Sequence, residues 1–237
     1  MARFLENKPL HSYLLKRIEG IYMETDTVFS SLNAQGFYNI HKLHNFRLIK
    51  YPNLSVRKSD NIIKLLYMAR VHPLKGVNLL FDLEARLKEL GMNNIIIDIY
   101  GPILENYKVE FLNKLENSQI NYKGILDPKD ISYTITKYDL MLFPTKYYTE
   151  GFPGTILDSY ICGLPVIATR WLNAEEFIEE GVTGYIVDFG NDKAFIEKVL
   201  YLVENPNLLH SLMLNIKAKR LHYSADKAWE ILKKSIK

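Results

Sequence analysis

The sequence predicts an α/β fold: a parallel sheet with helices on both faces, preceded by a partial strand–helix–strand unit. From residue 62 onward, short apolar runs that end at turn residues alternate with amphipathic stretches at helical spacing. Continuous apolar runs are typical of strands buried on both faces. Strands that alternate with helices in this way form parallel sheets with right-handed crossovers.

The composition excludes several other classes of protein. Of the 237 residues, 48% are hydrophobic and 24% are charged, as in ordinary globular domains. A formal net charge of +3 without a single basic run gives no nucleic-acid signal, and one cysteine, Cys162, excludes an internal disulfide framework. No apolar run approaches the roughly 18 residues of a membrane span, and Met1 does not open a signal peptide. We therefore expect a cytoplasmic protein, with peripheral contact at the inner face of a membrane as the alternative suggested by its basic C-terminus.

Residues 1–55 contain a single strand–helix–strand unit. Its predicted elements are the end of a helix at 14–20, a strand at 20–24, a helix capped by Thr25 or Asp26 and ended by Gly36, and a strand at 39–46. A lone unit of this kind buries too little surface to fold by itself. The polar stretch after Pro52 predicts a domain boundary at 55/56.

Residues 56–223 are predicted as the main domain, and residues 224–237 as a separate final helix. The predicted strands are 62–69, 94–101, 120–126, 139–144, 165–169 and 181–188. The predicted helices are 77–91, 107–117, 127–138, 155–161, 174–180, 192–204, about 207–219 and 224–236.

Two cations lie on the first strand-to-helix loop of this domain, ARVHPLKG. Arg70 and Lys75 follow a strand, and the next helix is expected to begin near Gly76. Free N–H groups at a helix start attract anions, so two added cations indicate a pocket for a diphosphate. The alternative is two surface cations in a loop.

A glycine-rich turn in the stretch 150–169, EGFPGTILDSYICGLPVIAT, carries two carboxylates. Glu150 precedes the turn, whereas Asp158 lies inside the helix that follows, which favours two carboxylates that hold different hydroxyls of one ligand over a general acid–base pair. The turn offers backbone N–H donors at Gly151, Phe152 and Gly154, while Pro153 has none. The alternative is that both carboxylates are buried partners in salt bridges.

Other candidate features are weaker. Gly101 ends a strand and would let a ligand approach the backbone, although turn chemistry alone explains such a glycine. The histidines show no metal spacing; His41 and His44 lie three apart on a predicted strand and would face opposite sides of it. We expect no metal site.

Six motifs in order resemble the nucleotide-binding C-terminal domain of GT-B fold glycosyltransferases, specifically family 4. They are ARVHPLKG with Arg70 and Lys75, IDIYG ending at Gly101, YKGIL around Gly124, LMLFPT, EGFPGTILDSYICGLPVIAT and EEGVTGYIV. The resemblance covers about residues 60–205. The usual family signature is Glu-x7-Glu, and here the shorter Asp158 stands at the second position. Pro153 stands where the commoner pattern has glycine.

The resemblance implies a Rossmann-like domain that binds a nucleotide-diphospho-sugar donor. Arg70 and Lys75 would hold the diphosphate, Asp158 the ribose, and Glu150 with the backbone of 151–154 the sugar. The remaining donor-binding positions would be Gly101, Lys123 and Gly124 near the base, and Thr155 at the start of the helix. Transfer would retain the anomeric configuration, and Arg70 and Lys75 would stabilise the departing phosphate without a metal or other cofactor.

The resemblance also implies an acceptor side that this chain resembles only in part. Family members have two Rossmann-like domains; here residues 1–55 resemble the end of the N-terminal one, and the final helix resembles the segment that crosses back to it. We expect donor binding with little transfer by this chain alone. It would be a truncated transferase, the donor-binding subunit of a two-chain transferase, or a non-catalytic nucleotide-sugar-binding module. The acceptor, a glycan or lipid-linked molecule, would bind through the missing domain or a partner chain.

Overall fold

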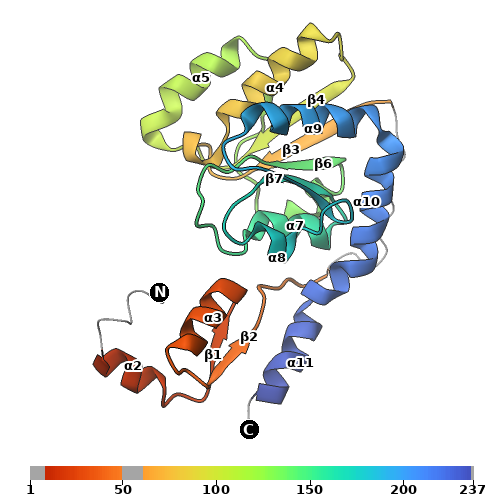
Figure 1. Cartoon of the computed structure of the whole chain (residues 1–237). Coiled ribbons are helices and arrows are strands. Elements are labelled where there is room, and N and C mark those ends of the chain that lie inside the picture. Colours follow the sequence, from red (N-terminus) through yellow and green to blue (C-terminus); the bar gives the residue numbers. More distant parts are fainter. Residues whose placement is uncertain (1–8, 50–60, 236–237) are drawn as a thin grey trace.

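The structure is a computed structural model that describes residues 9–49 and 61–235. Figure 1 shows two parts: a large α/β domain, and a smaller N-terminal unit that lies beside the last helix. The boundary predicted at 55/56 lies outside the described residues.

The large domain contains a six-stranded sheet in the order β5-β4-β3-β6-β7-β8, in which all neighbours are parallel. Its strands are β3 (Ile63–Met68), β4 (Ile95–Tyr100), β5 (Asn121–Tyr122), β6 (Leu140–Phe143), β7 (Val166–Thr169) and β8 (Gly184–Val187). Its helices are α4 (Asn78–Glu89), α5 (Lys108–Glu116), α6 (Ile131–Ile135), α7 (Gly154–Ile161), α8 (Ala174–Phe177), α9 (Asp192–Glu204) and α10 (Pro206–Lys219), with short 3-10 helices η1 (Pro73–Lys75), η2 (Glu105–Tyr107) and η3 (Arg220–Tyr223). The predicted fold class is confirmed.

Successive side chains of the central strands enter two different hydrophobic cores. Leu65 and Tyr67 belong to the core formed with α4, α5 and α9, whereas Leu66 belongs to the core formed with α6, α7 and α8. On β6, Leu142 and Met141 divide in the same way. Because side chains alternate along a strand, a sheet covered on both faces needs apolar residues at every position, which explains the continuous runs. Figure 1 shows α4 and α9 on one side of the sheet and α7 and α8 on the other.

Several predicted elements of the large domain are shorter than expected. The strand predicted at 120–126 is only β5, because this edge strand pairs with β4 at just two positions. The helix predicted at 127–138 is only α6. The helix predicted at 174–180 ends at Phe177, because Ile178 is extended and buried in the core and the N–H of Glu179 bonds instead to the Thr183 hydroxyl at 2.9 Å.

The N-terminal unit consists of α2 (Pro9–Leu15), β1 (Ile21–Met23), α3 (Asp26–Ala34) and β2 (Ile40–Lys42), with β1 and β2 parallel. Its core contains four buried residues, Met23, Leu32, Phe37 and Ile40. The Thr25 hydroxyl caps α3 by accepting from the N–H of Val28 at 3.4 Å. The strand predicted at 39–46 ends at Lys42, so the prediction that His41 and His44 face opposite sides of one strand is wrong: His44 lies beyond the strand.

The N-terminal unit contacts both the large domain and the last helix, α11 (Ala225–Ser235). Tyr22 and Ser235 share a hydrogen bond of 2.7 Å between their hydroxyls, which joins β1 to α11. The N–H of Asp26, at the start of α3, donates to the Glu176 carboxylate at 2.7 Å, and Thr27 donates to the Asn173 side chain at 2.8 Å. The final helix therefore runs beside the N-terminal unit, as Figure 1 shows.

Within the described residues, no helix has both the length and the apolar character needed to cross a bilayer.

Candidate functional site

The candidate site lies where the strand order of the large sheet changes direction. Strand β3 has β4 on one side and β6 on the other, so the chain leaves the carboxyl ends of β3 and β6 in opposite directions. In open α/β sheets such a switch point leaves a crevice between the two following loops, and ligands bind there. The loop after β3 carries Arg70 and Lys75, and the loop after β6 leads to Glu150.

The loop after β3 is fixed against the loop after β6 by a glycine. Gly76 has a positive φ of 77°, and a Cβ there would collide with the backbone carbonyl of Pro144. The N–H of Lys146 also donates to the Leu74 carbonyl at 2.9 Å. Only glycine permits this close approach at this backbone conformation, and the approach places Lys75 beside the second loop.

Lys75 and Glu150 form an ion pair across the crevice. Their side chains are only 17% and 13% exposed, and Thr145 donates a hydrogen bond of 3.1 Å to the same Glu150 oxygen. The Lys75 ammonium also lies 5.5 Å from the ring centre of Tyr147. The prediction that these residues share one site agrees with this geometry, although the pairing also matches the alternative of salt-bridged carboxylates.

Arg70 lies on the same loop as Lys75, shortly after the end of β3. Its side chain is exposed, and in the part of the chain that the structure describes its guanidinium has no hydrogen bond or ion pair. Its backbone carbonyl accepts from the hydroxyl of the buried Tyr67 at 3.1 Å, and the Lys75 carbonyl accepts from the same hydroxyl at 3.2 Å. Burial raises the pKa of Tyr67, so its hydroxyl stays protonated and holds both ends of this loop.

The glycine-rich turn is held by the loop after β7. The Asn173 side chain donates to the Glu150 carbonyl at 2.9 Å, and the Trp171 indole donates to the Gly151 carbonyl at 3.3 Å. At the other end, the Thr155 hydroxyl donates to the Met68 carbonyl of β3 at 2.7 Å. The turn is thus anchored at both ends. The first N–H groups of α7, which have no acceptor within the helix, are therefore held in place where the turn ends and the helix begins.

Aromatic side chains support the turn from behind. Phe152 is buried, and its ring stacks on Phe177 with centroids 4.0 Å apart and planes 2° apart. The rings of His44 and Tyr223 pack against Phe152 at 6.3 and 5.5 Å. The side chain of Phe152 is therefore a packing residue, and only its backbone remains a candidate donor contact.

Asp158 is paired with a residue of the N-terminal part of the chain. Its Oδ1 accepts from Arg47 Nε at 2.7 Å, and its side chain is 16% exposed. Burial raises the pKa of this carboxyl above its usual value, although the hydrogen bond and the charge of Arg47 act in the opposite direction. Asp158 and Glu150 therefore both form ion pairs in the structure, Glu150 with Lys75 on the loop after β3 and Asp158 with Arg47 of the N-terminal part.

Gly101, Lys123 and Gly124 lie together at the carboxyl ends of β4 and β5. The N–H of Gly101 donates to the Gly124 carbonyl at 2.9 Å, and that of Lys123 to the Ile99 carbonyl at 2.8 Å. Gly101 has a φ of 135°, and a Cβ there would collide with the Ala69 carbonyl. Packing against the end of β3 is thus enough to require this glycine, and a role in donor binding stays a prediction.

Several residues at the site were missed by the sequence analysis. Asn173 and Trp171 lie beyond the recognised turn, and Arg47 lies in the segment assigned to the N-terminal unit. Their positions depend on how distant loops meet, for which the local sequence pattern carries no signal. Thr145 belongs to the LMLFPT motif and could have been found there.

Among the side chains that the structure describes, no group of three or more His, Cys, Asp or Glu residues is placed to hold a metal ion. That the reaction needs no metal stays a prediction.

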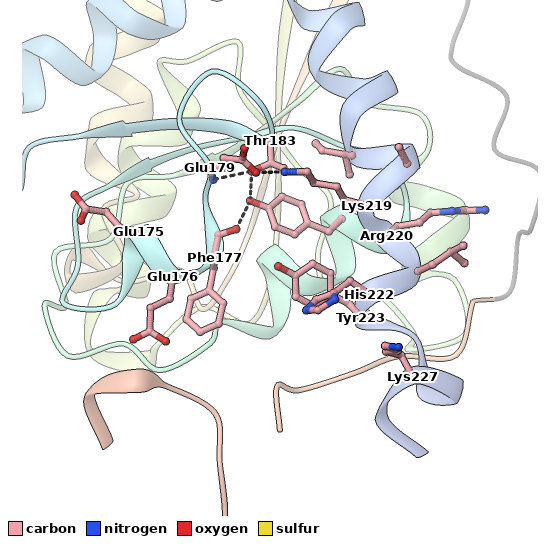
Figure 2. A pocket seen from close by; sticks show the side chains of 14 residues that line it. Glu175, Glu176, Phe177, Glu179, Thr183, Lys219, Arg220, His222, Tyr223 and Lys227 are labelled. Atoms are coloured by element: carbon pink, nitrogen blue, oxygen red, sulfur yellow. Dashed lines mark hydrogen bonds and ion pairs between the residues drawn. The ribbon is translucent and has the colours of Figure 1, made fainter. Parts of the chain in front are cut away.

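A cavity of about 710 Å³ lies behind the turn, and Figure 2 shows it from close by. It lies between the α8–β8 region and the junction of α10, η3 and α11. Lys219 and Glu179 form an ion pair at its edge, and the Tyr160 hydroxyl donates to the Phe177 carbonyl at 2.9 Å. None of the predicted site residues lines this cavity.

Comparison with known proteins agrees with this geometry. A family model described as "Glycosyl transferases group 1" matches residues 55–219. Two relatives are an N,N'-diacetylbacillosaminyl-diphospho-undecaprenol alpha-1,3-N-acetylgalactosaminyltransferase of Campylobacter jejuni, 25% identical over 82% of this chain and 49% of the relative, and the capsular polysaccharide biosynthesis glycosyltransferase CapM of Staphylococcus aureus, 27% identical over 86% and 52%. The chain thus spans about half the length of these relatives.

Solved structures show the same fold. Anabaena HepE in complex with UDP has a TM-score of 0.79 at 18% identity, covering 95% of this chain and 65% of HepE. S. aureus TarM in complex with UDP and other ligands has a TM-score of 0.76 at 21% identity, covering 93% and 44%. The large domain therefore has the architecture of the C-terminal Rossmann-like domain of GT-B transferases, and the chain belongs to the family of glycosyl transferases group 1.

Proposed function

We propose that this chain is the donor-binding part of a retaining glycosyltransferase of family 4, in which a nucleotide-diphospho-sugar gives its glycosyl group to a glycan or lipid-linked acceptor. The observation that carries the proposal is the position of Arg70, Lys75 and Glu150. All three lie on the two loops at the switch point of the sheet, where Lys75 pairs with Glu150 and Gly76 permits the loops to approach closely.

Arg70 and Lys75 bind the diphosphate of the donor. The Arg70 guanidinium has its N–H groups available, and Lys75 has one close carboxylate partner in a partly buried setting. Negative charge grows on the departing phosphate as the glycosyl group leaves. Two cations that contact the diphosphate stabilise that charge without a metal, and the stabilisation reaches several kcal/mol where the bound donor excludes water.

Glu150 and the backbone of 151–154 hold the sugar, and Asp158 holds the ribose. Lys123, Gly124 and Gly101 lie along the base, next to the end of β3. HepE and TarM have both been solved in complex with UDP, which supports a nucleotide donor of this kind.

In the proposed reaction the bond between the anomeric carbon and the diphosphate oxygen breaks through an oxocarbenium-like transition state. The oxygen of an acceptor hydroxyl forms its bond on the same face of the sugar, which retains the configuration. The electron pair of the broken bond leaves with the nucleoside diphosphate, and the proton of the acceptor passes to the departing phosphate or to water.

The donor site is tested by the melting temperature of the protein with UDP, GDP and ADP. We expect one of these nucleotides to raise it, and Arg70→Ala or Lys75→Ala to abolish the shift. Lys146→Ala is the matched control, because Lys146 lies on the neighbouring loop but pairs with Asp192 at 2.7 Å. No shift with any of the three nucleotides would refute the donor site.

A two-chain transferase is the second candidate, and exposed apolar side chains on the N-terminal unit support it and a truncated transferase alike. Tyr38 is 89% exposed, and Leu10, Tyr13 and Leu14 are each more than half exposed on α2. Exposed apolar side chains such as the three on α2 are typical of surfaces that another polypeptide covers. We expect negligible transfer by this chain alone; robust turnover with a purified lipid-linked acceptor would contradict both forms of the proposal.

A further inference from the structure

Arg47 is a residue of the N-terminal part of the chain whose side chain reaches the start of α7, at the end of the glycine-rich turn. Its backbone is fixed at the junction between η3 and α11: its N–H donates to the Tyr223 carbonyl at 3.0 Å, and its carbonyl accepts from the N–H of Ala225 at 3.0 Å. Arg47 and Ser224 form an isolated parallel bridge there. Both backbone groups of Arg47 are therefore hydrogen-bonded, so the position from which its side chain extends is fixed, unlike that of an arginine on a loop without such bonds.

The guanidinium lies beside the first turn of α7. Nε donates to Asp158 Oδ1 at 2.7 Å, and Nη1 donates to the Phe46 carbonyl at 3.1 Å and to the Asn45 side chain at 3.3 Å. Nη2 lies 3.1 Å from the point that a Cβ of Gly154 would occupy, at the end of the glycine-rich turn. Within the described part of the chain Nη2 makes no hydrogen bond, and the side chain is 38% exposed, so Nη2 is accessible to a ligand.

This position is electrostatically unusual for a cation. A helix start carries partial positive charge from its free N–H groups, so a guanidinium there is unfavourable unless an anion balances it. Asp158 supplies one negative charge, and its carboxylate contacts the guanidinium at Arg47 Nε. The outer edge of the guanidinium, with Nη2, remains turned toward the α7 start without an anionic partner. Arginine keeps its charge at all ordinary pH values and binds phosphate oxygens in a fork, so the missing partner matches a phosphate.

We propose that Arg47 is a further donor-binding residue: Nε stays on Asp158 while Nη2 binds the phosphate group next to the ribose. The inference rests on the proposed function, in which Asp158 holds the ribose and α7 begins at the glycine-rich turn. A guanidinium between these two features lies at the ribose–phosphate junction of such a donor. Because the backbone of Arg47 is bonded at the start of α11, donor binding then depends on how the N-terminal segment is seated.

The inference predicts that removing the Arg47 guanidinium lowers affinity only for ligands that carry a phosphate. A series of ligands with two, one and no phosphate groups, bound to the full chain, measures this loss. Isothermal titration compares UDP, UMP and uridine, with the matching GDP and ADP series, for the wild type, Arg47→Gln and Arg47→Lys. We expect Arg47→Gln to lower the ratio of UDP affinity to uridine affinity by at least about tenfold, the size of one charge-assisted hydrogen bond. Arg47→Lys keeps the charge but not the forked pair of donors, so its ratio of UDP affinity to uridine affinity is expected to lie between those of the wild type and Arg47→Gln.

Two controls separate this role from others. Arg170→Gln removes the same charge from an exposed arginine that pairs with Glu175 and Asp188, and should leave the ratio unchanged. If Arg47→Gln alone fails to fold because it strands the Asp158 carboxylate, Arg47→Gln/Asp158→Asn is compared with Asp158→Asn, and the ratio should still fall.

Each result decides between the inference and its alternatives. An unchanged ratio, with uridine and UDP weakened or strengthened equally, overturns the inference and leaves Arg47 as a partner of Asp158 only. A wild type that binds none of the nucleotides overturns the proposed function and the inference together. A wild type that binds UDP, GDP or ADP with a ratio insensitive to Arg47 overturns the inference alone.

Discussion

The large domain and the N-terminal unit are held together in different ways. The large domain buries apolar side chains on both faces of a six-stranded sheet, in two cores that extend from β4 to β8. The N-terminal unit has a two-stranded sheet and four buried core residues, Met23, Leu32, Phe37 and Ile40. Two strands with so small a core are marginal in water, so the unit must gain much of its stability from what it contacts.

Those contacts are polar as well as apolar. Asp26 and Thr27 at the start of α3 bond to Glu176 and Asn173 of the large domain. Asn173 also holds the Glu150 carbonyl. The same side chain therefore fixes the candidate donor turn and receives the N-terminal unit. The difference between the cores indicates that the large domain folds around its own sheet, whereas the N-terminal unit is ordered by docking on the large domain near the candidate site.

The largest expected effects on stability distinguish the core of the large domain from that of the N-terminal unit. Phe195→Ala removes a fully buried ring from α9 and should lower the free energy of unfolding of the large domain by about 3–5 kcal/mol. Phe37→Ala removes an equally buried ring from the N-terminal unit, and should release β1 and β2 while the main transition changes little. Urea denaturation measures the first effect, and hydrogen exchange of 21–43 against 63–68 measures the second.

Equal losses of global stability in both variants would contradict this separation, because they would show a single cooperative unit. A local loss of protection confined to 21–43 in Phe37→Ala would support it.

The next effect tests whether the large domain positions its site without the N-terminal unit. Gly76→Ala forces a side chain into a left-handed conformation against the Pro144 carbonyl, and should cost about 1–3 kcal/mol. It should also displace Lys75 from Glu150 and reduce the thermal shift by the nucleotide that binds the wild type. Gly190→Ala is the control, since Gly190 also has positive φ but has nothing near its missing Cβ. A similar loss of nucleotide binding in both variants would argue against a positioning role for Gly76.

Local patterns predicted the large domain well for a physical reason. Strands such as β6 and β7 are buried on both faces, so every residue must be apolar and the run is visible in the sequence. Arg70 and Lys75 follow β3 and Glu150 follows β6, and because these two strands are neighbours, the strand order brings the two loops to one edge of the sheet. Arg47 escaped notice because its place at α7 depends on a return of the chain over more than a hundred residues.

Element ends were harder to predict because tertiary contacts set them. β5 stops after two residues since only two positions pair with β4, although the apolar residues beside it suggested a longer strand. His44 was assigned to a strand that stops two residues earlier, and its ring packs instead edge-on against the stacked rings of Phe152 and Phe177. No pattern in the local sequence specifies that contact.

A smaller effect tests the docking of the N-terminal unit directly. Glu176 is largely buried and accepts from the N–H of Asp26 at 2.7 Å and from Lys42 at 3.4 Å. Glu176→Gln keeps the shape but removes the charge, and should weaken docking by about 1–2 kcal/mol, seen as faster hydrogen exchange in 21–42. Glu175→Gln is the matched control on the same helix, because Glu175 is exposed and pairs with Arg170. If Glu176→Gln changed hydrogen exchange relative to the wild type only outside residues 21–42, the result would contradict the predicted docking role.

The smallest effect is a dependence of docking on pH through His44. Burial lowers the pKa of His44 below 6.5, and the charges of Lys42 and His222 lower it further, while the hydrogen bond to the Glu24 carbonyl and the charge of Asp26 act oppositely. Between the lowered pKa and 6.5 the unfolded chain binds more protons than the folded one, so stability falls as pH falls through that window.

Unfolding in urea at pH 7.5 and 5.5 measures this dependence. His44→Phe keeps a ring among Phe152, Phe177 and Tyr223 but cannot be protonated, so it should lose less stability on acidification than the wild type does. The exposed His210, changed to Gln, is the control and should leave the wild-type dependence intact. If His44→Phe and the wild type lose the same stability between the two pH values, His44 does not link protonation to the seating of the N-terminal unit. A reduced loss would show that the residue behind the donor turn also senses pH at the junction between the two parts.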